Sequence, residues 1–168
     1  MREETANTSS VFDELSNAAG DAQSESYESA LGSLEGQTNT TETVEQELEG
    51  LMEQVNGTLS TEDVQFDEAM VKENLDEILL LLIAFRGEAH GKELLSDLSQ
   101  LFDATLSPGT VYPALHALNE DDVLALHTKV RTKEYSINDG AHVRNTVEQT
   151  MVQHLAFGLL LYAFLGRL

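Results

Sequence analysis

Residues 107–118 read SPGTVYPALHAL, and this stretch decides the fold. Both prolines of the 168-residue chain fall in it, at Pro108 and Pro113, where an apolar pattern with helical spacing begins. Ser107 suits the N-cap position, and Pro108 suits the first helical position, where no backbone donor is needed. Because Pro113 removes an amide one turn later, we expect a tight or irregular first turn in a helix that runs to about residue 121.

The outward residues at the start of this predicted helix are small or carry polar groups. They are Gly109, Thr110, Tyr112, Pro113 and His116. A helix N-terminus with free amides and hydroxyl groups binds phosphate well, because the positive end of the helix dipole points there. We therefore expect DNA contact, with Thr110 and Tyr112 on phosphates and His116 on a base edge or a phosphate. A purely structural helix start is the alternative.

Periodicity predicts the elements on either side. We expect helices over residues 67–86 and 91–103, a turn between them, a β-hairpin over 123–138 and one long helix over 139–168. Three helices followed by a hairpin form a winged helix-turn-helix, in which the third helix enters the major groove of DNA. The expected fold class is mostly α with a small β-hairpin, a winged helix-turn-helix plus a long C-terminal dimerisation helix.

The predicted hairpin carries a cluster of basic residues. Lys129, Arg131 and Lys133 are three of the nine Lys and Arg residues of the chain. Because the chain otherwise has few basic residues, this clustering favours phosphate contact over an ordinary solvated turn.

The quoted stretch has a family resemblance. Together with AHGKEL at residues 89–94 and KEYSI at 133–137, it resembles the PadR family of winged-helix transcriptional regulators over about residues 75–138. Two positions depart from the family pattern: Lys92 replaces the usual aromatic residue, and Asp122 replaces the usual glycine after the recognition helix. The matching positions in the recognition helix are Ser107, Gly109, Thr110, Tyr112, Pro113, Leu115 and Leu118.

The resemblance implies a role for each of these parts. It implies DNA binding through the matched residues at the start of the recognition helix, including Ser107, Gly109 and Pro113. It also implies a homodimer that forms through the C-terminal helix, and small-molecule sensing at the dimer interface, although no residue here identifies an effector.

The last segment is almost continuously apolar from Leu155 onward. Its uninterrupted part is shorter than the roughly 20 residues that span a bilayer. A helix that is apolar all round must bury its whole surface, so we favour a dimer interface over an intramolecular core helix or a membrane contact. The expected interface residues are Val147, Met151, Leu155, Gly158, Tyr162 and Leu165, with Phe157, Leu161 and Phe164 as further anchors.

The net charge of −21 is unevenly distributed, with −16 in residues 1–71. We expect residues 1–65 to be an acidic, largely disordered extension with a short helix near 43–55, residues 66–138 to be the winged-helix domain and residues 139–168 the dimerisation helix. The extension is interpreted as a solvated tail, a protein-interaction arm or an arm that folds over the basic wing. Acidity with few lysines and no cysteine is typical of proteins from a high-salt cytoplasm.

The preferred interpretation is a cytoplasmic, homodimeric repressor that binds an inverted-repeat operator in double-stranded DNA. The alternative is a winged-helix protein-interaction module that no longer binds DNA. We expect no enzyme, cofactor or membrane association, because no catalytic set, phosphate loop or signal peptide is present. We also expect no metal site, because the five histidines do not stand at metal-ligand spacing and cysteine is absent.

Overall fold

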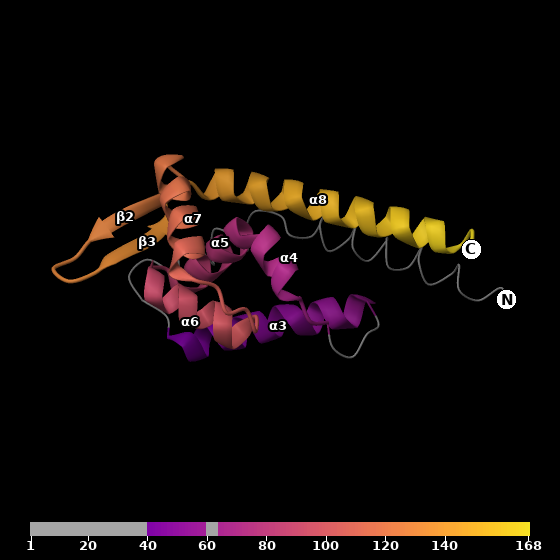
Figure 1. Cartoon of the computed structure of the whole chain (residues 1–168), viewed down its shortest axis with the longest axis horizontal. Coiled ribbons are helices and arrows are strands. Elements are labelled where there is room, and N and C mark those ends of the chain that lie inside the picture. Colours follow the sequence, from indigo (N-terminus) through magenta and orange to yellow (C-terminus); the bar gives the residue numbers. More distant parts are fainter. Residues whose placement is uncertain (1–39, 60–63) are drawn as a thin grey trace.

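The structure is a computed structural model that describes residues 40–59 and 64–168. The disorder expected before residue 40 lies outside these residues. Figure 1 shows a helical body with a β-hairpin at one end and a long helix that extends away from it. The helices are α3 (Thr41–Leu59), α4 (Glu68–Glu73), α5 (Leu75–Arg86), α6 (Gly91–Leu101), α7 (Pro108–Glu120) and α8 (Gly140–Leu165), and the strands are β1 (Ala89–His90), β2 (Leu124–Thr128) and β3 (Lys133–Ile137).

The expected mostly α fold, a winged helix-turn-helix with a small β-hairpin and a long C-terminal helix, is confirmed. Helices α5, α6 and α7 precede the β2–β3 hairpin, which is the wing, and α8 follows it. The sheet is antiparallel with strand order β1-β3-β2. Strand β1 lies in the stretch that was expected to be only a turn, and it pairs Ala89 with Tyr135. A strand of two residues has no alternating pattern, so periodicity gives no signal for it.

The prediction of a single helix over residues 67–86 is wrong, because the helix is interrupted at Asn74. The backbone amide and the side-chain amide of Asn74 both donate to the carbonyl of Met70, at 3.1 and 2.9 Å. Asparagine side chains compete in this way with helical hydrogen bonding and favour helix ends. Helix α4 is therefore a short piece, which Asp67 caps by accepting from the amide of Met70 at 2.8 Å.

Helix α5 occupies the centre of the core, as its continuous apolar run predicted. It buries Leu79, Leu80, Leu82 and Ile83. Helices α6, α7 and strand β2 pack around it through Leu94, Leu98, Val111, Leu115 and Leu124. Helix α3 covers the expected helix over 43–55, and its Val44 is fully buried in the same core. The acidic α3 is therefore part of the folded body.

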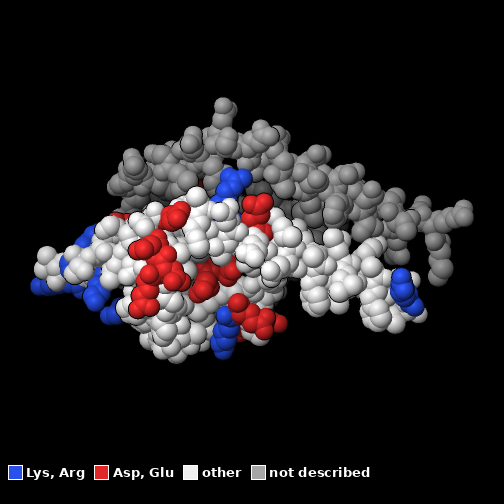
Figure 2. All heavy atoms as spheres, turned by 90° about the horizontal axis from the view of Figure 1, so that it is seen from above, with Lys and Arg blue, Asp and Glu red and all other residues white. Residues whose placement is uncertain are grey.

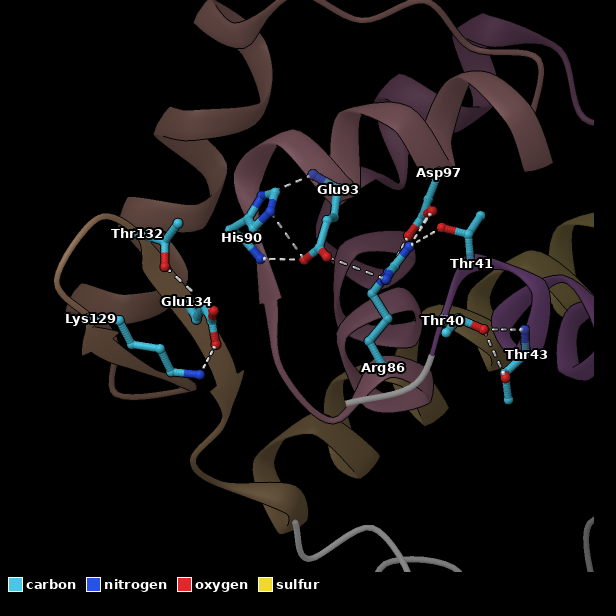
Figure 3. Close-up of polar contacts among 10 residues, drawn as sticks. All are labelled: Thr40, Thr41, Thr43, Arg86, His90, Glu93, Asp97, Lys129, Thr132 and Glu134. Atoms are coloured by element: carbon cyan, nitrogen blue, oxygen red, sulfur yellow. Dashed lines mark hydrogen bonds and ion pairs between the residues drawn. The ribbon is translucent and has the colours of Figure 1, made fainter. Parts of the chain in front are cut away.

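A buried ion pair joins three helices (Figure 3). Arg86 Nε donates to Asp97 Oδ2 at 2.6 Å, and Arg86 Nη2 donates to Asp97 Oδ1 at 2.8 Å. The same Nη2 donates to Thr41 Oγ1 at 2.6 Å, so the pair connects α5 and α6 to the first residue of α3. Only 3% of the Arg86 side chain and none of the Asp97 side chain is exposed. The hydrogen bonds to Asp97 hold the pKa of Arg86 above its ordinary value.

The junctions at the two ends of the hairpin are tied together. Asp122, which stands where the family usually has glycine, has a φ of 58°. Aspartate tolerates this left-handed conformation better than most residues, so the turn keeps the geometry that glycine would give it. The carbonyl of Asp122 accepts from Asn138 Nδ2 at 2.8 Å, and the carbonyl of Val123 accepts from the backbone amide of Asn138 at 2.9 Å. The end of α7 is thereby fixed to the start of α8.

The ion pair makes a prediction about stability. Asp97→Ala removes the two short charged hydrogen bonds of buried Arg86 and leaves it the longer contact to Glu93, at 3.7 Å, and we expect it to lower the free energy of unfolding by about 3–5 kcal/mol. The double variant Arg86→Met/Asp97→Leu, which removes both charges, should recover most of that loss. Denaturant unfolding measures both. A loss below about 1 kcal/mol for Asp97→Ala would contradict this account.

Candidate nucleic-acid interface

The start of α7 is tight and rich in hydroxyl groups. The carbonyl of Ser107 accepts from the amide of Thr110 at 2.9 Å and from the amide of Val111 at 3.2 Å. The first is the i to i+3 hydrogen bond of a 3₁₀ turn, and the second is the usual i to i+4 bond of an α-helix. Ser107 occupies the N-cap position as expected, but its hydroxyl pairs with Thr110 Oγ1 at 3.1 Å rather than with a backbone amide. Both hydroxyl groups are exposed together with Gly109 and Pro113, and Pro113 is accommodated inside the helix.

A groove lies between α7 and the wing, and we name it the wing groove. It has a volume of about 510 Å³. Three segments line it: the start of α6, one side of α7 and the tip of the hairpin. Its lining residues are His90, Gly91, Lys92, Tyr112, His116, Arg131, Thr132, Lys133 and Tyr135. The structure therefore brings Tyr112, His116, Arg131 and Lys133, four of the residues predicted to contact DNA, to one groove.

The contact between Gly91 and Tyr112 shapes the floor of the wing groove. A Cβ atom at Gly91 would lie 2.4 Å from Cε1 of the Tyr112 ring, so no larger residue fits without displacing that ring. Gly91 is buried and Tyr112 is half-buried, which means that α6 and α7 approach closely at this point. Tyr135 lines the same groove, and burial raises the pKa of its hydroxyl, with Tyr112 as the second cause.

His90 and Lys92 belong to the wing groove, although they were not among the predicted contact residues. His90 caps α6: its Nδ1 accepts from the amide of Glu93 at 3.2 Å, while Glu93 Oε2 accepts from the amide of His90 at 3.0 Å (Figure 3). This reciprocal pairing fixes the imidazole at the groove edge. The sequence held one signal for Lys92, a cation close to a family motif in a chain with few cations.

The three basic residues of the wing, Lys129, Arg131 and Lys133, have different surroundings. Lys129 Nζ donates to Glu134 (Figure 3). It also donates to Glu88 Oε2 at 3.1 Å. These two bonds raise the pKa of Lys129 above its ordinary value, the bond to Glu134 contributing most. Lys129 therefore braces the hairpin against the body, whereas Arg131 and Lys133 line the wing groove.

The charge distribution separates the wing from the rest of the surface. In Figure 2, several Lys and Arg side chains gather at the wing end, whereas Asp and Glu cover the middle of the same face. A local basic surface on an acidic protein directs a polyanion to that surface and away from the remainder. The wing groove, with Lys92, Arg131 and Lys133, is thus suited to a phosphate backbone.

Helix α8 is attached at its first half only. Val143 packs against the core, and Thr150 Oγ1 donates to Glu77 Oε1 at 2.6 Å. Every residue after Thr150 is exposed. The predicted interface residues Val147, Met151, Leu155, Gly158, Tyr162 and Leu165 are all exposed in the single chain. Within the described residues, no helix combines the length and hydropathy that crossing a bilayer requires.

The comparison with known families fits this arrangement. The model of the transcriptional regulator PadR-like family matches residues 78–145. We refer to the matched residues 78–145 as the PadR-like domain. The resemblance expected from the sequence is confirmed, and the match includes α7, the wing and the first residues of α8.

Proteins similar to this chain occur in haloarchaea. It is 46% identical over 96 residues to the transcriptional activator GvpE1 of Halobacterium salinarum, covering 57% of this chain and 50% of the relative. It is 46% identical over 91 residues to the transcriptional activator GvpE of Haloferax mediterranei, covering 54% of this chain and 47% of the relative. A third, the transcriptional activator GvpE2 of Halobacterium salinarum, is 39% identical over 90 residues, which are 54% of this chain and 47% of that relative. The chain thus spans about half the length of the curated relatives it matches.

The packing of Gly91 makes a second prediction. Gly91→Ala places a methyl group against the Tyr112 ring, and we expect it to lower the free energy of unfolding by about 1–3 kcal/mol. Gly50→Ala in α3 is the matched control, because a Cβ atom there meets nothing within 4 Å. The control should be unchanged or more stable by roughly 0.5–1 kcal/mol, since alanine favours helix. Thermal unfolding of both variants checks the contrast, and equal effects would contradict the close approach.

Proposed function

We propose that this PadR-like chain is a sequence-specific DNA-binding regulator of transcription. The observation that carries the proposal is the wing groove, which holds Lys92, Arg131 and Lys133 beside α7 in a chain with a net charge of −21. Surfaces that bind nucleic acid combine a local basic patch with a helix that fits a groove of the duplex. Both are present on the same side of one domain.

In this proposal α7 enters the major groove, and the hydroxyl groups of Ser107, Thr110 and Tyr112 contact phosphates beside it. Arg131 and Lys133 hold the flanking backbone. His116 is exposed on α7 and faces a base edge or a phosphate. Lys129 supports the wing through Glu134 and Glu88 instead of binding DNA directly.

The acidic balance fits a cytoplasm with a high salt concentration, where such a regulator meets its DNA. At molar salt the Debye length is about 3 Å, so the net charge repels a phosphate only at short range. Contacts made directly in the wing groove then matter more than the overall charge. The organisms of the relatives, Halobacterium and Haloferax, support this setting.

The functional unit is a homodimer joined through the exposed half of α8. A helix with Leu155, Phe157, Leu161, Tyr162 and Phe164 all exposed needs a partner surface. A two-fold dimer presents two copies of α7 to successive major grooves, about 34–36 Å apart, and therefore recognises an inverted repeat.

The output that we propose is activation. Repression was expected from the sequence, by obstruction of polymerase. The three relatives all carry the name transcriptional activator, which favours the opposite sign for this chain. The second candidate function, a protein-interaction module without DNA binding, has less support because it gives no reason for the cations of the wing groove.

The decisive experiment is binding of the chain to its own promoter DNA across a potassium chloride series. We expect Arg131→Ala and Lys133→Ala each to reduce the slope of log K against log salt by about 0.9. Lys129→Ala should change the slope less, because its charge is already paired. Lys72→Ala is the matched control, since Lys72 pairs with Glu68 at 2.6 Å and does not line the groove.

The outcomes separate the two candidates. Specific binding with the expected slope changes supports the regulator. Absence of specific binding at every salt concentration would reject it and favour the interaction module.

The dimer has a separate test. Leu161→Glu introduces a charge in the exposed apolar half of α8, and we expect it to halve the molar mass measured by light scattering. Val130→Glu is the control, because Val130 is also exposed but lies at the wing tip. A dimeric Leu161→Glu variant would argue against α8 as the interface.

A further inference from the structure

The exposed apolar side chains of the described residues lie in three places. One is Val130 at the wing tip, and another is α8. The third is a corner where α3 meets the start of α4, outside the PadR-like domain of residues 78–145. Its exposed members are Leu51, Val55, Leu59, Phe66 and Met70. Apolar side chains concentrated in this way indicate a contact surface.

Beside these side chains lies a groove of about 600 Å³, which we name the corner groove, and Phe66 is the one exposed member that lines it. Its apolar lining comes from three segments: α3, the residues before α4, and the end of α6. These side chains are Leu48, Met52, Val64, Phe66, Leu101 and Phe102. Asp67, Glu68 and Asp103 are also among the lining residues, and no Lys or Arg is. The groove is therefore of mixed character: apolar side chains share its lining with the amides Asn56, Gln65 and Gln100 and with the three carboxylates.

The groove has a defined shape because its walls are held by specific bonds. Asn56 Oδ1 accepts from the amide of Val64 at 3.0 Å, which ties the end of α3 to the segment before α4. Arg86 holds the start of α3 through Thr41. The wall formed by α3 is therefore fixed at both ends.

The end of α8 has the chemistry that matches this groove. Its last turns are apolar, and Arg167 follows directly after them. Arg167 is the only Lys or Arg in residues 145–168. An apolar helix end that carries a cation complements a groove whose lining offers apolar side chains and carboxylates but no Lys or Arg.

The length and direction of α8 allow a second copy to supply this end. The 15 helical residues from Met151 to Leu165 extend about 22 Å at 1.5 Å per residue. In Figure 1, α8 and α3 extend toward the same side of the molecule, with α4 between them. A second copy that approaches antiparallel along α8 brings its own helix end back to the first body. Two-fold symmetry then fills both grooves in the same way.

We propose that the corner groove binds the end of α8 from a second copy of this chain. Helix α3 then forms part of the dimer interface, although it lies outside the PadR-like domain. This inference rests on the homodimer of the proposed function and adds a named site to it. It gives α3 a role in assembly rather than only in covering the core.

Cysteine crosslinking tests the contact cleanly, because the chain has no cysteine of its own. We mix full-length Met52→Cys chains with full-length Leu165→Cys chains under mild oxidation. The expected result is a disulfide-linked dimer that forms much faster in the mixture than in either variant alone. Mixing Val130→Cys with Leu165→Cys is the matched control for random collision, because Val130 lies at the wing tip.

A second measurement uses Met52→Glu, which places a charge in the groove. We expect it to weaken dimerisation roughly ten-fold or more, as for a buried interface anchor, while the helical content measured by circular dichroism stays unchanged. A wild-type chain that is dimeric by light scattering but shows no crosslink above the Val130 control would overturn the inference and leave the homodimer standing. A wild-type chain that stays monomeric at every concentration would instead overturn the homodimer, and the inference with it.

Discussion

The ion pair between Arg86 and Asp97 is the constraint on which the other parts depend. Two charges without access to water are stable only when each satisfies the other, so α5 and α6 have one relative position in which both groups are paired. Arg86 also reaches Thr41, and this bond brings an acidic helix from outside the PadR-like domain onto the same body. The position of α6 in turn sets where Gly91 meets Tyr112 and hence the floor of the wing groove.

The wing groove illustrates how an acidic chain forms a site for a polyanion. Its cations come from two separate segments, Lys92 from α6 and Arg131 and Lys133 from the hairpin. Lys129 is the nearest basic neighbour in sequence, yet its charge is neutralised by Glu134 and Glu88. The pairing gives the hairpin a fixed base, and a rigid wing loses less conformational entropy when it binds. The acidic residues near the wing therefore contribute to the interface by holding it in place.

Sequence reasoning predicted the parts of the fold that local signals encode. Pro108 marked the start of α7, the alternating residues marked the hairpin, and the apolar run of α5 marked the core. It missed one local competition and the features that depend on contacts between distant residues. The break at Asn74 is a local competition inside an apolar pattern, and β1 exists only because Ala89 pairs with Tyr135. The same limit applied to the wing groove, since no local pattern joins His90 and Lys92 to Arg131.

The hydrogen bonds that join Asp122 and Val123 to Asn138 set the angle between α7 and α8. These bonds fix the end of α7 to the start of α8. Helix α7, proposed to contact DNA, and helix α8, proposed to join two copies, therefore keep one relative orientation. In the proposed dimer, the separation of the two copies of α7 is then determined at this junction and not at the DNA surface. The number of base pairs between two half-sites would then follow from the backbone geometry at Asp122, so this turn would set the spacing of the operator that the dimer recognises.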